Sequence, residues 1–443
     1  MSKSALCNVA VILLVAVASL DAADKQLLSA SFPILEHNFH FNVRTLGYFS
    51  LFSNLSYALS LPFWGYLVHR LGVKKIYLIL ASSCCCWGVS TIFIAILGSS
   101  VFGQALMRMI NGWMLGSILP LSQTLMVEFI PKSMRGRAFG IMAMFEKLSA
   151  TLAASFSVYC EDHWTVPYWI LGCMSLVFGY MVKICLNPEA CNYSFKNDID
   201  KSSKITLKQI VQRIARLPAF RCLVAQGIFG GTPWDMMSFQ LLLLEWRGFT
   251  KSQIVTLQFV SGIAGTFGGY IGGVLGDYYF SMYSTKGRIG IALLSILGGI
   301  PLYGIFLYST SYTFALTSLS CFHFVATWSP AAAIRPICVE LTHNPSERAQ
   351  IVAMWIVLEK ASAAIFGAPL VGLLTNRALK SIESSSVLSD EEKSNVMANN
   401  LFLLSSLFWG VCAWFWILMI SRLPQKNDNV IDRNQQLSGE HLT

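Results

Sequence analysis

The residues best able to do chemistry in this chain are ionisable side chains that occur inside long apolar segments. A charged group at the centre of a lipid bilayer costs about 3 kcal/mol or more, so such residues face a cavity or a partner and mark solute or proton pathways. We therefore expect them to bind a substrate or a proton. They are Asp21, Asp24 and Lys25 in the first segment, Arg108 in the fourth, Glu146 and Lys147 in the fifth, and Glu359 and Lys360 in the eleventh.

Each of these charges also has a structural alternative. A carboxylate paired with Lys or Arg is neutralised and fixes helix packing without binding a ligand. Asp21 and Asp24 are three residues apart and share one helix face, whereas a Glu and the Lys directly after it do not face each other. We therefore expect one member of each Glu-Lys pair to point into a cavity and the other toward a partner helix or the membrane interface.

The seventh and tenth segments add further candidates. Pro233 can break the seventh segment and free backbone carbonyls for a ligand. Gln226, Trp234 and Asp235 lie near it, and they either bind substrate or pack around a kink. Arg335 in the tenth segment is a candidate for binding an anionic head group, with a salt bridge to a glutamate as the alternative.

Motifs of enzymes, metal sites and cofactor sites are absent from the sequence. It has no G-x-S-x-G, H-E-x-x-H, Walker A or Rossmann glycine run. The twelve cysteines lack zinc-site spacing, and several occur in apolar segments, where they act as small buried hydrophobes. We therefore expect no enzyme, no metal and no cofactor. Trp87, Trp113 and Trp328 are assigned to packing and left out of the site.

The composition is that of a membrane protein. Of the 443 residues, 54% are hydrophobic and 12% charged, whereas a soluble domain averages about 25% charged residues. The net charge of +9 comes from basic residues in short loops, not from a basic surface, so we expect no nucleic-acid partner. Membrane lipids and a small-molecule or lipid substrate are the expected partners, with the protein as a monomer.

Twelve apolar segments are long enough to cross a bilayer as helices, which needs about 20 residues. The sequence therefore predicts an all-α membrane protein with twelve transmembrane helices. The segments cover residues 6–34, 45–68, 76–98, 101–128, 137–160, 166–186, 219–244, 252–278, 289–310, 312–340, 349–375 and 398–420.

The two halves of the chain repeat one pattern at an offset of about 210 residues. The sequence E-K-x-S-A begins at Glu146 and again at Glu359, and Arg135 and Arg348 each precede those glutamates by eleven residues. Six-helix repeats in one orientation are a known plan of secondary transporters. We predict an N-terminal six-helix bundle over 1–186, a cytoplasmic linker over 187–218, a C-terminal six-helix bundle over 219–421 and a cytoplasmic tail over 422–443.

Loop charges predict that both termini are cytoplasmic. In that orientation the loops richest in Lys and Arg lie on the cytoplasmic side, as the positive-inside rule requires. For two segments the sequence leaves two interpretations open. Residues 202–217 are either a basic amphipathic helix at the membrane surface or a solvated linker. The first apolar run is either an uncleaved helix or a signal peptide.

Two basic motifs resemble signatures of the major facilitator superfamily. The run after the second segment resembles G-x-x-x-D-R-x-G-R-R, with His69 in the place of the family's Asp, and R-G-R-A-F-G opens the fifth segment. The resemblance implies a conformational lock between the two halves, made weaker or pH-sensitive by the histidine. The residues of these motifs and of their echoes in the second half are Gly65, His69, Arg70, Gly72, Lys74, Lys75, Arg135, Arg137, Gly273, Asp277 and Arg348.

A narrower resemblance is to Spinster-type transporters of lysolipids and sphingolipids. Asp24-Lys25 with Pro33 resembles their D-R…P first helix, and the second half is similar to a Spinster-related group of plants, algae and protists. For proton-coupled relatives, the resemblance implies that the first-helix Asp is protonated together with a fourth-helix acid. The matching position here is Leu115, so that pair is not carried over.

We interpret the chain as a transporter of a small organic solute or lysolipid. Transport would be either secondary active, with a proton as one candidate coupling ion, or facilitative. The halves would rock around a binding cavity at the membrane midplane, giving alternating access. The alternative is a membrane receptor or sensor on a transporter scaffold, which binds a ligand without moving it.

Overall fold

The computed structural model describes residues 3–71, 73–130, 135–160, 163–186, 218–340, 345–383 and 389–421. Within these residues the secondary structure is helical, with no strand. Helix is the form in which one segment satisfies its own backbone hydrogen bonds in lipid. The expected linker lies outside the described residues apart from Pro218, which begins the next helix, and the expected tail lies outside them entirely.

The first half of the chain folds into one bundle of long helices. A short helix, α2, follows α1 after a one-residue interruption at Ser31. The helices are α1 (Lys3–Ala30), α2 (Phe32–Phe39), α3 (Val43–Leu71), α4 (Val73–Ile96), α5 (Val101–Phe129), α6 (Arg135–Tyr159) and α7 (Thr165–Cys185).

The second half forms a similar bundle whose helices are more often interrupted. The elements are α10 (Pro218–Met236), η3 (Met237–Phe239), α11 (Gln240–Trp246), α12 (Lys251–Tyr283), α13 (Thr285–Tyr308), α14 (Tyr312–Ala326), η4 (Pro330–Ile334), α15 (Arg335–Glu340), α16 (Pro345–Phe366), α17 (Ala368–Glu383) and α18 (Asp390–Ile420). Pro233 lies inside α10, so the expected break comes four residues later, where the 3₁₀ turn η3 begins at Met237.

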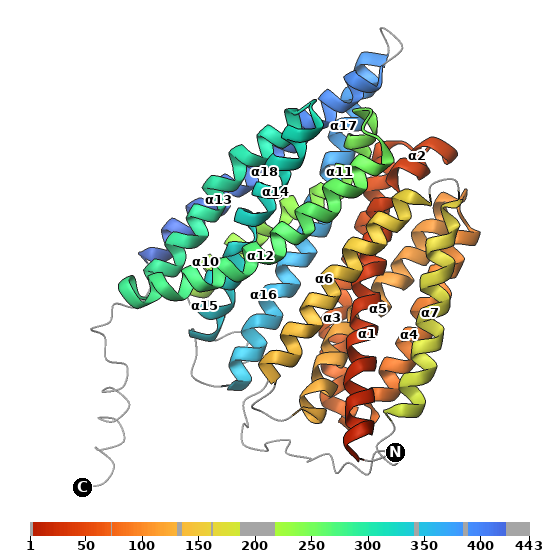
Figure 1. Cartoon of the computed structure of the whole chain (residues 1–443), viewed down its shortest axis with the longest axis vertical. Coiled ribbons are helices and arrows are strands. Elements are labelled where there is room, and N and C mark those ends of the chain that lie inside the picture. The colour runs from red at the N-terminus through yellow and green to blue at the C-terminus, as the bar shows by residue number, and fades with distance from the viewer. Residues whose placement is uncertain are drawn as a thin grey trace.

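Figure 1 shows the two bundles lying close together where α2, α11 and α17 meet and diverging toward the end where α1 begins. We call the first region the junction. There α3 packs against α17, and α2 against α11. Phe32 and Phe239 bring their ring centroids to 5.0 Å across the two halves, within a continuous apolar core. The halves are thus held together by apolar packing at one end.

Seven helical stretches among the described residues are long and apolar enough to cross a membrane by length and composition alone. They include α4, α7 and α13, but not α1, which carries Asp21, Asp24 and Lys25. The all-helical, two-bundle fold predicted from the sequence is confirmed. Glu146, Lys147, Glu359 and Lys360 lie in two of these stretches, whereas the charges of α1 and Arg108 of α5 lie outside them.

Glycines let α3 and α5 approach until their backbones touch. A Cβ at Gly112 would collide with the Ser53 carbonyl, and one at Gly116 with Ser60. Small residues at such contacts are the usual basis of helix packing in lipid, where no hydrophobic force drives helices together. This close packing places Arg108 and Asn111 of α5 beside α1 and α3.

Candidate functional site: ionisable groups between the bundles

Asp24 is the best-connected carboxylate of the N-terminal bundle. It is buried, and it accepts hydrogen bonds from the Trp87 indole, from Thr91 Oγ1 at 2.8 Å and from Asn111 Nδ2 at 3.4 Å. Asn111 also donates to Thr91 at 2.9 Å. Three donors from α4 and α5 thus fix the Asp24 carboxylate in one orientation.

Lys25 and Asp21 form an ion pair one turn apart on α1. The Nζ–Oδ2 distance is 2.7 Å, with Asp21 buried and Lys25 one-third exposed. Lys25 also lies 4.4 Å from the centroid of the Tyr57 ring on α3. The two aspartates of α1 therefore have different partners: Asp21 pairs with Lys25, and Asp24 faces the neutral donors.

Arg108 is a buried guanidinium with few hydrogen bonds. Its Nη2 donates to the Tyr168 hydroxyl at 3.4 Å, and its Nε has no partner among the described residues. The guanidinium carbon lies 5.5 Å from the centroid of Phe49. Asp24, Lys25, Arg108 and Asn111 line one cavity of about 50 Å³, to which Ser238 of the other half contributes. This polar cavity therefore borders both bundles.

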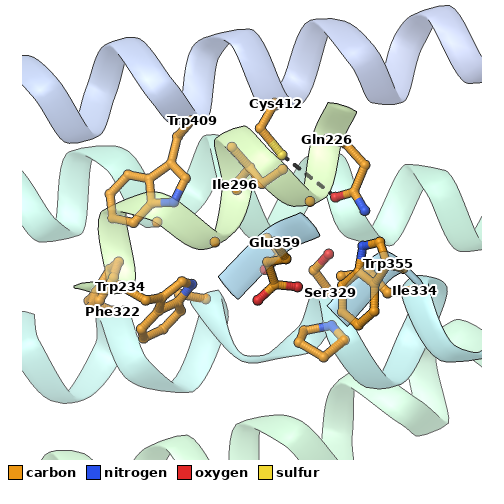
Figure 2. Close-up of a pocket in the computed structure, with 17 residues that line it drawn as sticks. Gln226, Trp234, Ile296, Phe322, Ser329, Ile334, Trp355, Glu359, Trp409 and Cys412 are labelled. Atoms are coloured by element: carbon orange, nitrogen blue, oxygen red, sulfur yellow. Dashed lines mark hydrogen bonds between the residues drawn. The ribbon is translucent and has the colours of Figure 1, made fainter. Parts of the chain in front are cut away.

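A second cavity, of about 110 Å³, lies within the C-terminal bundle (Figure 2). Trp234, Trp355, Trp409 and Phe322 form much of its wall. The helix α14 ends at Ala326, and the π-helical turn η4 follows at Pro330–Ile334. Ser329, Pro330 and Ile334, in and just before this turn, contribute to the wall. Such π turns often occur at functional sites. This second cavity is mainly aromatic, whereas the first is mainly polar.

Glu359 brings a charge to the aromatic cavity. Its side chain is 13% exposed, and Oε1 lies 3.2 Å from Lys360 Nζ. This contact differs from the expectation that adjacent Glu and Lys point apart, because the long Lys side chain folds back to its neighbour. Gln226 is buried in the same wall, donates to the Leu223 carbonyl at 2.9 Å and accepts from the Cys412 thiol at 3.8 Å.

Asp235 does not line either cavity; it joins the two halves at the junction. Oδ1 accepts from Asn54 Nδ2 of α3 at 2.5 Å, and Oδ2 accepts from the Ala368 backbone N–H at 3.0 Å. Ala368 begins α17, whose N-terminal N–H groups and dipole favour a carboxylate. Asp235 thus connects α10, α17 and α3, and we call this arrangement the Asp235 contact.

The remaining predicted site residues lie apart from the two cavities. Glu146 and Lys147 are on α6 and line neither of them. Glu146 is partly buried and has a partner, and Lys147 is exposed but within electrostatic reach of His323. Arg335 is the first residue of α15, but its side chain lies outside the described part of the chain.

The predicted conformational motifs are only partly described. Asp277 pairs with Arg288 at 2.9 Å within the C-terminal half, and Arg288 also donates to the Ala332 carbonyl. Among the described residues, a Cβ added at Gly65 would meet nothing within 4 Å, and one added at Gly273 would meet only Ala331. The side chains of His69, Arg70, Lys74, Arg135, Arg137 and Arg348, and the whole of Gly72, lie outside the described part; Lys75 is exposed at the start of α4.

Several residues of the site were missed by sequence reasoning. Trp87 was assigned to packing, yet its indole N–H donates to Asp24. Thr91, Asn54 and Tyr57 were not singled out, because neutral polar residues carry no strong signal in an apolar segment. They lie in the second and third apolar segments, which contain no candidate charge, so the sequence offers no signal for them.

Comparison with known proteins places this geometry in a family. A model of the Major Facilitator Superfamily matches residues 14–368. The chain belongs to the Major Facilitator Superfamily. Two helix bundles joined at one end, with ionisable groups between them, are the arrangement that this superfamily uses to surround a midplane site.

Two curated members of the superfamily are similar to this chain in sequence. The probable sulfoacetate transporter SauU of Cupriavidus necator is 23% identical over 62% of this chain and 65% of its own length. The niacin transporter NiaP of Acinetobacter baylyi is 24% identical over 64% of this chain and 62% of its own length. The chain thus spans a little under two thirds of the length of these relatives.

Solved superfamily structures share the fold. A bacterial homologue of the human lysosomal transporter Spinster, inward-facing and unoccupied, has a TM-score of 0.77 at 14% identity and covers 95% of this chain and 99% of its own. A D-xylose–proton symporter has a TM-score of 0.66 at 13% identity, covering 94% and 98%. The Spinster-like resemblance is confirmed at the level of fold; the plant and protist grouping stays a prediction.

The Asp235 contact allows a direct test of how the junction holds the halves together. Replacing Asn54 by alanine removes one hydrogen bond across the halves, worth about 1 kcal/mol. We expect the population with a separated junction to rise about fivefold, since 1.4 kcal/mol corresponds to tenfold. Electron–electron distance measurements between spin labels attached to cysteines that replace Asn38 and Lys380 report this population. Both positions are exposed, one on each half. Among the cysteines whose exposure the structure describes, Cys86, Cys173 and Cys321 are exposed and are replaced first.

A matched control is Asn400→Ala on α18. Asn400 donates to Thr375 of α17 at 3.1 Å, a hydrogen bond of the same kind but inside one half. The distance distribution should not change in this variant. An equal shift in both variants would mean that the junction responds to general loosening and not to the Asp235 contact.

Proposed function

We propose that the chain is a transmembrane transporter of a small organic solute that works by alternating access. The observation that carries the proposal is the polar cavity around Asp24 and Arg108, which borders both bundles. A buried, incompletely hydrogen-bonded Arg108 is costly inside a membrane protein unless a ligand or a moving partner uses it. No covalent chemistry enters this mechanism.

Movement of the halves follows from where they are joined. Transport requires the junction to separate while the opposite end closes, and the solute needs only to bind both states. The Asp235 contact would break and form once in each cycle. Coupling to a proton would use a carboxylate that faces the interior, and Asp24 and Glu359 are the two that line the cavities.

The proposal extends to arrangement in the membrane. In this proposal the protein is a multi-pass membrane protein with both termini on the cytoplasmic side, and it acts as a monomer. Relatives that carry sulfoacetate, niacin or D-xylose are of small-solute type, and this supports a small solute more than a macromolecular cargo. A lysolipid, suggested by the resemblance to Spinster, remains within the proposed class.

Counterflow in proteoliposomes tests the proposal. Vesicles containing the purified chain are loaded with unlabelled solute and diluted into trace labelled solute, for a panel that includes sulfoacetate, nicotinate, D-xylose, choline and a lysophospholipid. A transporter accumulates the label transiently for at least one of them. A receptor binds the label without exchange, and that result would overturn the proposal. A pH-sensitive dye inside the vesicles separates proton-coupled from facilitative transport.

A further inference from the structure

The cavity of the C-terminal bundle has a chemistry that the transport mechanism leaves unexplained. Its wall combines three tryptophans and a phenylalanine with a single carboxylate, Glu359. Trp234 and Trp409 each lie within 6 Å of Phe322, measured between ring centroids, at 5.8 and 5.7 Å. These rings form a connected aromatic surface, and Glu359 is the acid on the wall beside it.

Figure 2 shows the Glu359 carboxylate between Trp234 on one side and Trp355 on the other. The carboxylate is mostly buried, and aromatic rings lie on both sides of it. Coulombic attraction is stronger in such an environment than in water. A cation that entered the cavity would therefore meet a carboxylate and several aromatic side chains together.

We propose that this cavity binds an organic ammonium group of the transported solute. Aromatic rings around a cationic nitrogen attract it through their quadrupoles, and they favour alkylated ammonium groups, whose methyl or methylene groups also bury apolar area. Glu359 supplies the opposite charge. The inference rests on the proposed transport function and names the chemical class of its substrate.

Lys360 is the internal cation that occupies Glu359 in the absence of a ligand. Its ammonium lies 3.2 Å from Glu359, and the side chain is 49% exposed on a flexible stem. Tyr57 and Asp235 are within its electrostatic reach. An incoming ammonium group can therefore take over Glu359 while Lys360 turns to these partners at the interface of the halves.

This exchange would connect binding to the junction. Asp235 is the residue that holds α3, α10 and α17 together. When Lys360 turns toward Asp235, its ammonium group competes with the Asn54 donor for the carboxylate. Ligand binding in the aromatic cavity thereby weakens the contact that keeps the junction closed. A solute that lacks a cation leaves Lys360 on Glu359 and has no such effect.

The wall also indicates an oxygen atom on the same solute. Trp355 Nε1 is a buried donor without a hydrogen-bond partner among the described residues. A buried donor left unsatisfied costs about 1–3 kcal/mol. A hydroxyl or carbonyl oxygen a few atoms from the ammonium nitrogen would satisfy it. An anionic solute fits this cavity poorly, because Glu359 repels it.

Binding of choline and of its neutral isostere 3,3-dimethylbutan-1-ol to the purified full chain tests the proposal. The two molecules have nearly the same shape and the same hydroxyl, and they differ in the charge at the branched centre. We expect choline to bind at least tenfold more tightly, measured by quenching of tryptophan fluorescence and by displacement of labelled choline. Equal binding of both molecules, no binding of choline, or tighter binding of nicotinate would overturn the proposal.

Two variants of adjacent residues should change choline affinity in opposite directions. Glu359→Gln removes the counter-ion, and we expect at least a tenfold loss. Lys360→Met removes the internal competitor, and we expect a gain of about threefold to tenfold. Loss of affinity in both variants would indicate that the ion pair is only structural, and this would contradict the exchange. Matched controls are Glu391→Gln and Trp414→Ala, both exposed on α18 and away from the cavity.

The binding and counterflow measurements can fail independently. Choline binding without exchange of any solute would keep the ammonium site and overturn transport. Exchange of a neutral or anionic solute, with no choline binding, would keep transport and overturn the ammonium site. Wild-type protein alone decides between choline and its isostere, so the test does not depend on the folding of any variant.

Discussion

Replacing Asp24 by alanine is expected to destabilise the N-terminal bundle and to abolish transport. The substitution leaves the Trp87 indole without an acceptor, whereas Thr91 can still donate to the Trp87 carbonyl and Asn111 to Thr91. A buried donor without a partner costs about 1–3 kcal/mol, and the two weakened donors add to this loss. The apparent midpoint of thermal unfolding in detergent should fall by about 5 °C or more. Counterflow should fall by more than tenfold.

The conservative variant Asp24→Asn separates charge from hydrogen bonding. All three donors contact Oδ2 of Asp24, so the amide oxygen of the asparagine can accept in its place as a weaker, uncharged acceptor, and we expect a loss of about 1 kcal/mol. If transport needs the charge or a proton on this residue, Asp24→Asn stays inactive despite being nearly as stable as the wild type. Full activity in Asp24→Asn would show that Asp24 is a structural acceptor, and proton coupling would then have to use another group.

Asp390→Asn is a suitable control for these measurements. Asp390 is exposed at the start of α18, where it pairs with Lys393 at 2.8 Å. Exposed pairs contribute about 0–1 kcal/mol, so neither stability nor transport should change detectably. If stability or counterflow fell comparably in this control, the Asp24 effect would reflect a general sensitivity of the protein to the loss of any carboxylate.

Replacing Gly112 by valine is expected to have the second large effect. The Cβ would collide with the Ser53 carbonyl of α3, which is backbone and cannot rotate away. The helices must therefore move apart. Overpacking typically costs about 1–3 kcal/mol, and a collision with backbone falls at or above the upper end of that range. The midpoint of thermal unfolding should fall, and the yield of folded protein with it.

This displacement would also reach the polar cavity. Arg108 and Asn111 lie within one turn of Gly112 on α5, and both line that cavity. We therefore expect Gly112→Ala, the smaller change, to reduce counterflow more than it reduces stability. Gly410→Ala on α18 is the matched control, because a Cβ there meets nothing within 4 Å. A Gly112→Ala protein as stable and active as Gly410→Ala would mean that α3 and α5 pack less closely than described.

The sequence by itself determined the class of protein and the helices that carry charge. Apolar segments of about 20 residues can satisfy their backbone in lipid only as helices, so length and composition are sufficient for that inference. The E-K-x-S-A repeat, with Arg135 and Arg348 eleven residues before its glutamates, indicated two similar halves, and the family match and shared fold agree with this. The rarity of charge in such segments also selected Asp24, Arg108 and Glu359 without structural information.

Only the tertiary structure decided the partner of each charge. Asp21 meets Lys25 one turn away on the same helix, but that Asp24 meets Trp87 depends on how α1 packs against α4 and α5. Asp235 was expected to bind substrate, and its partners Asn54 and Ala368 lie 181 and 133 residues away in the chain. No local pattern encodes such contacts, because they depend on the approach of helices that are distant in the chain, within one half for Ala368 and between halves for Asn54.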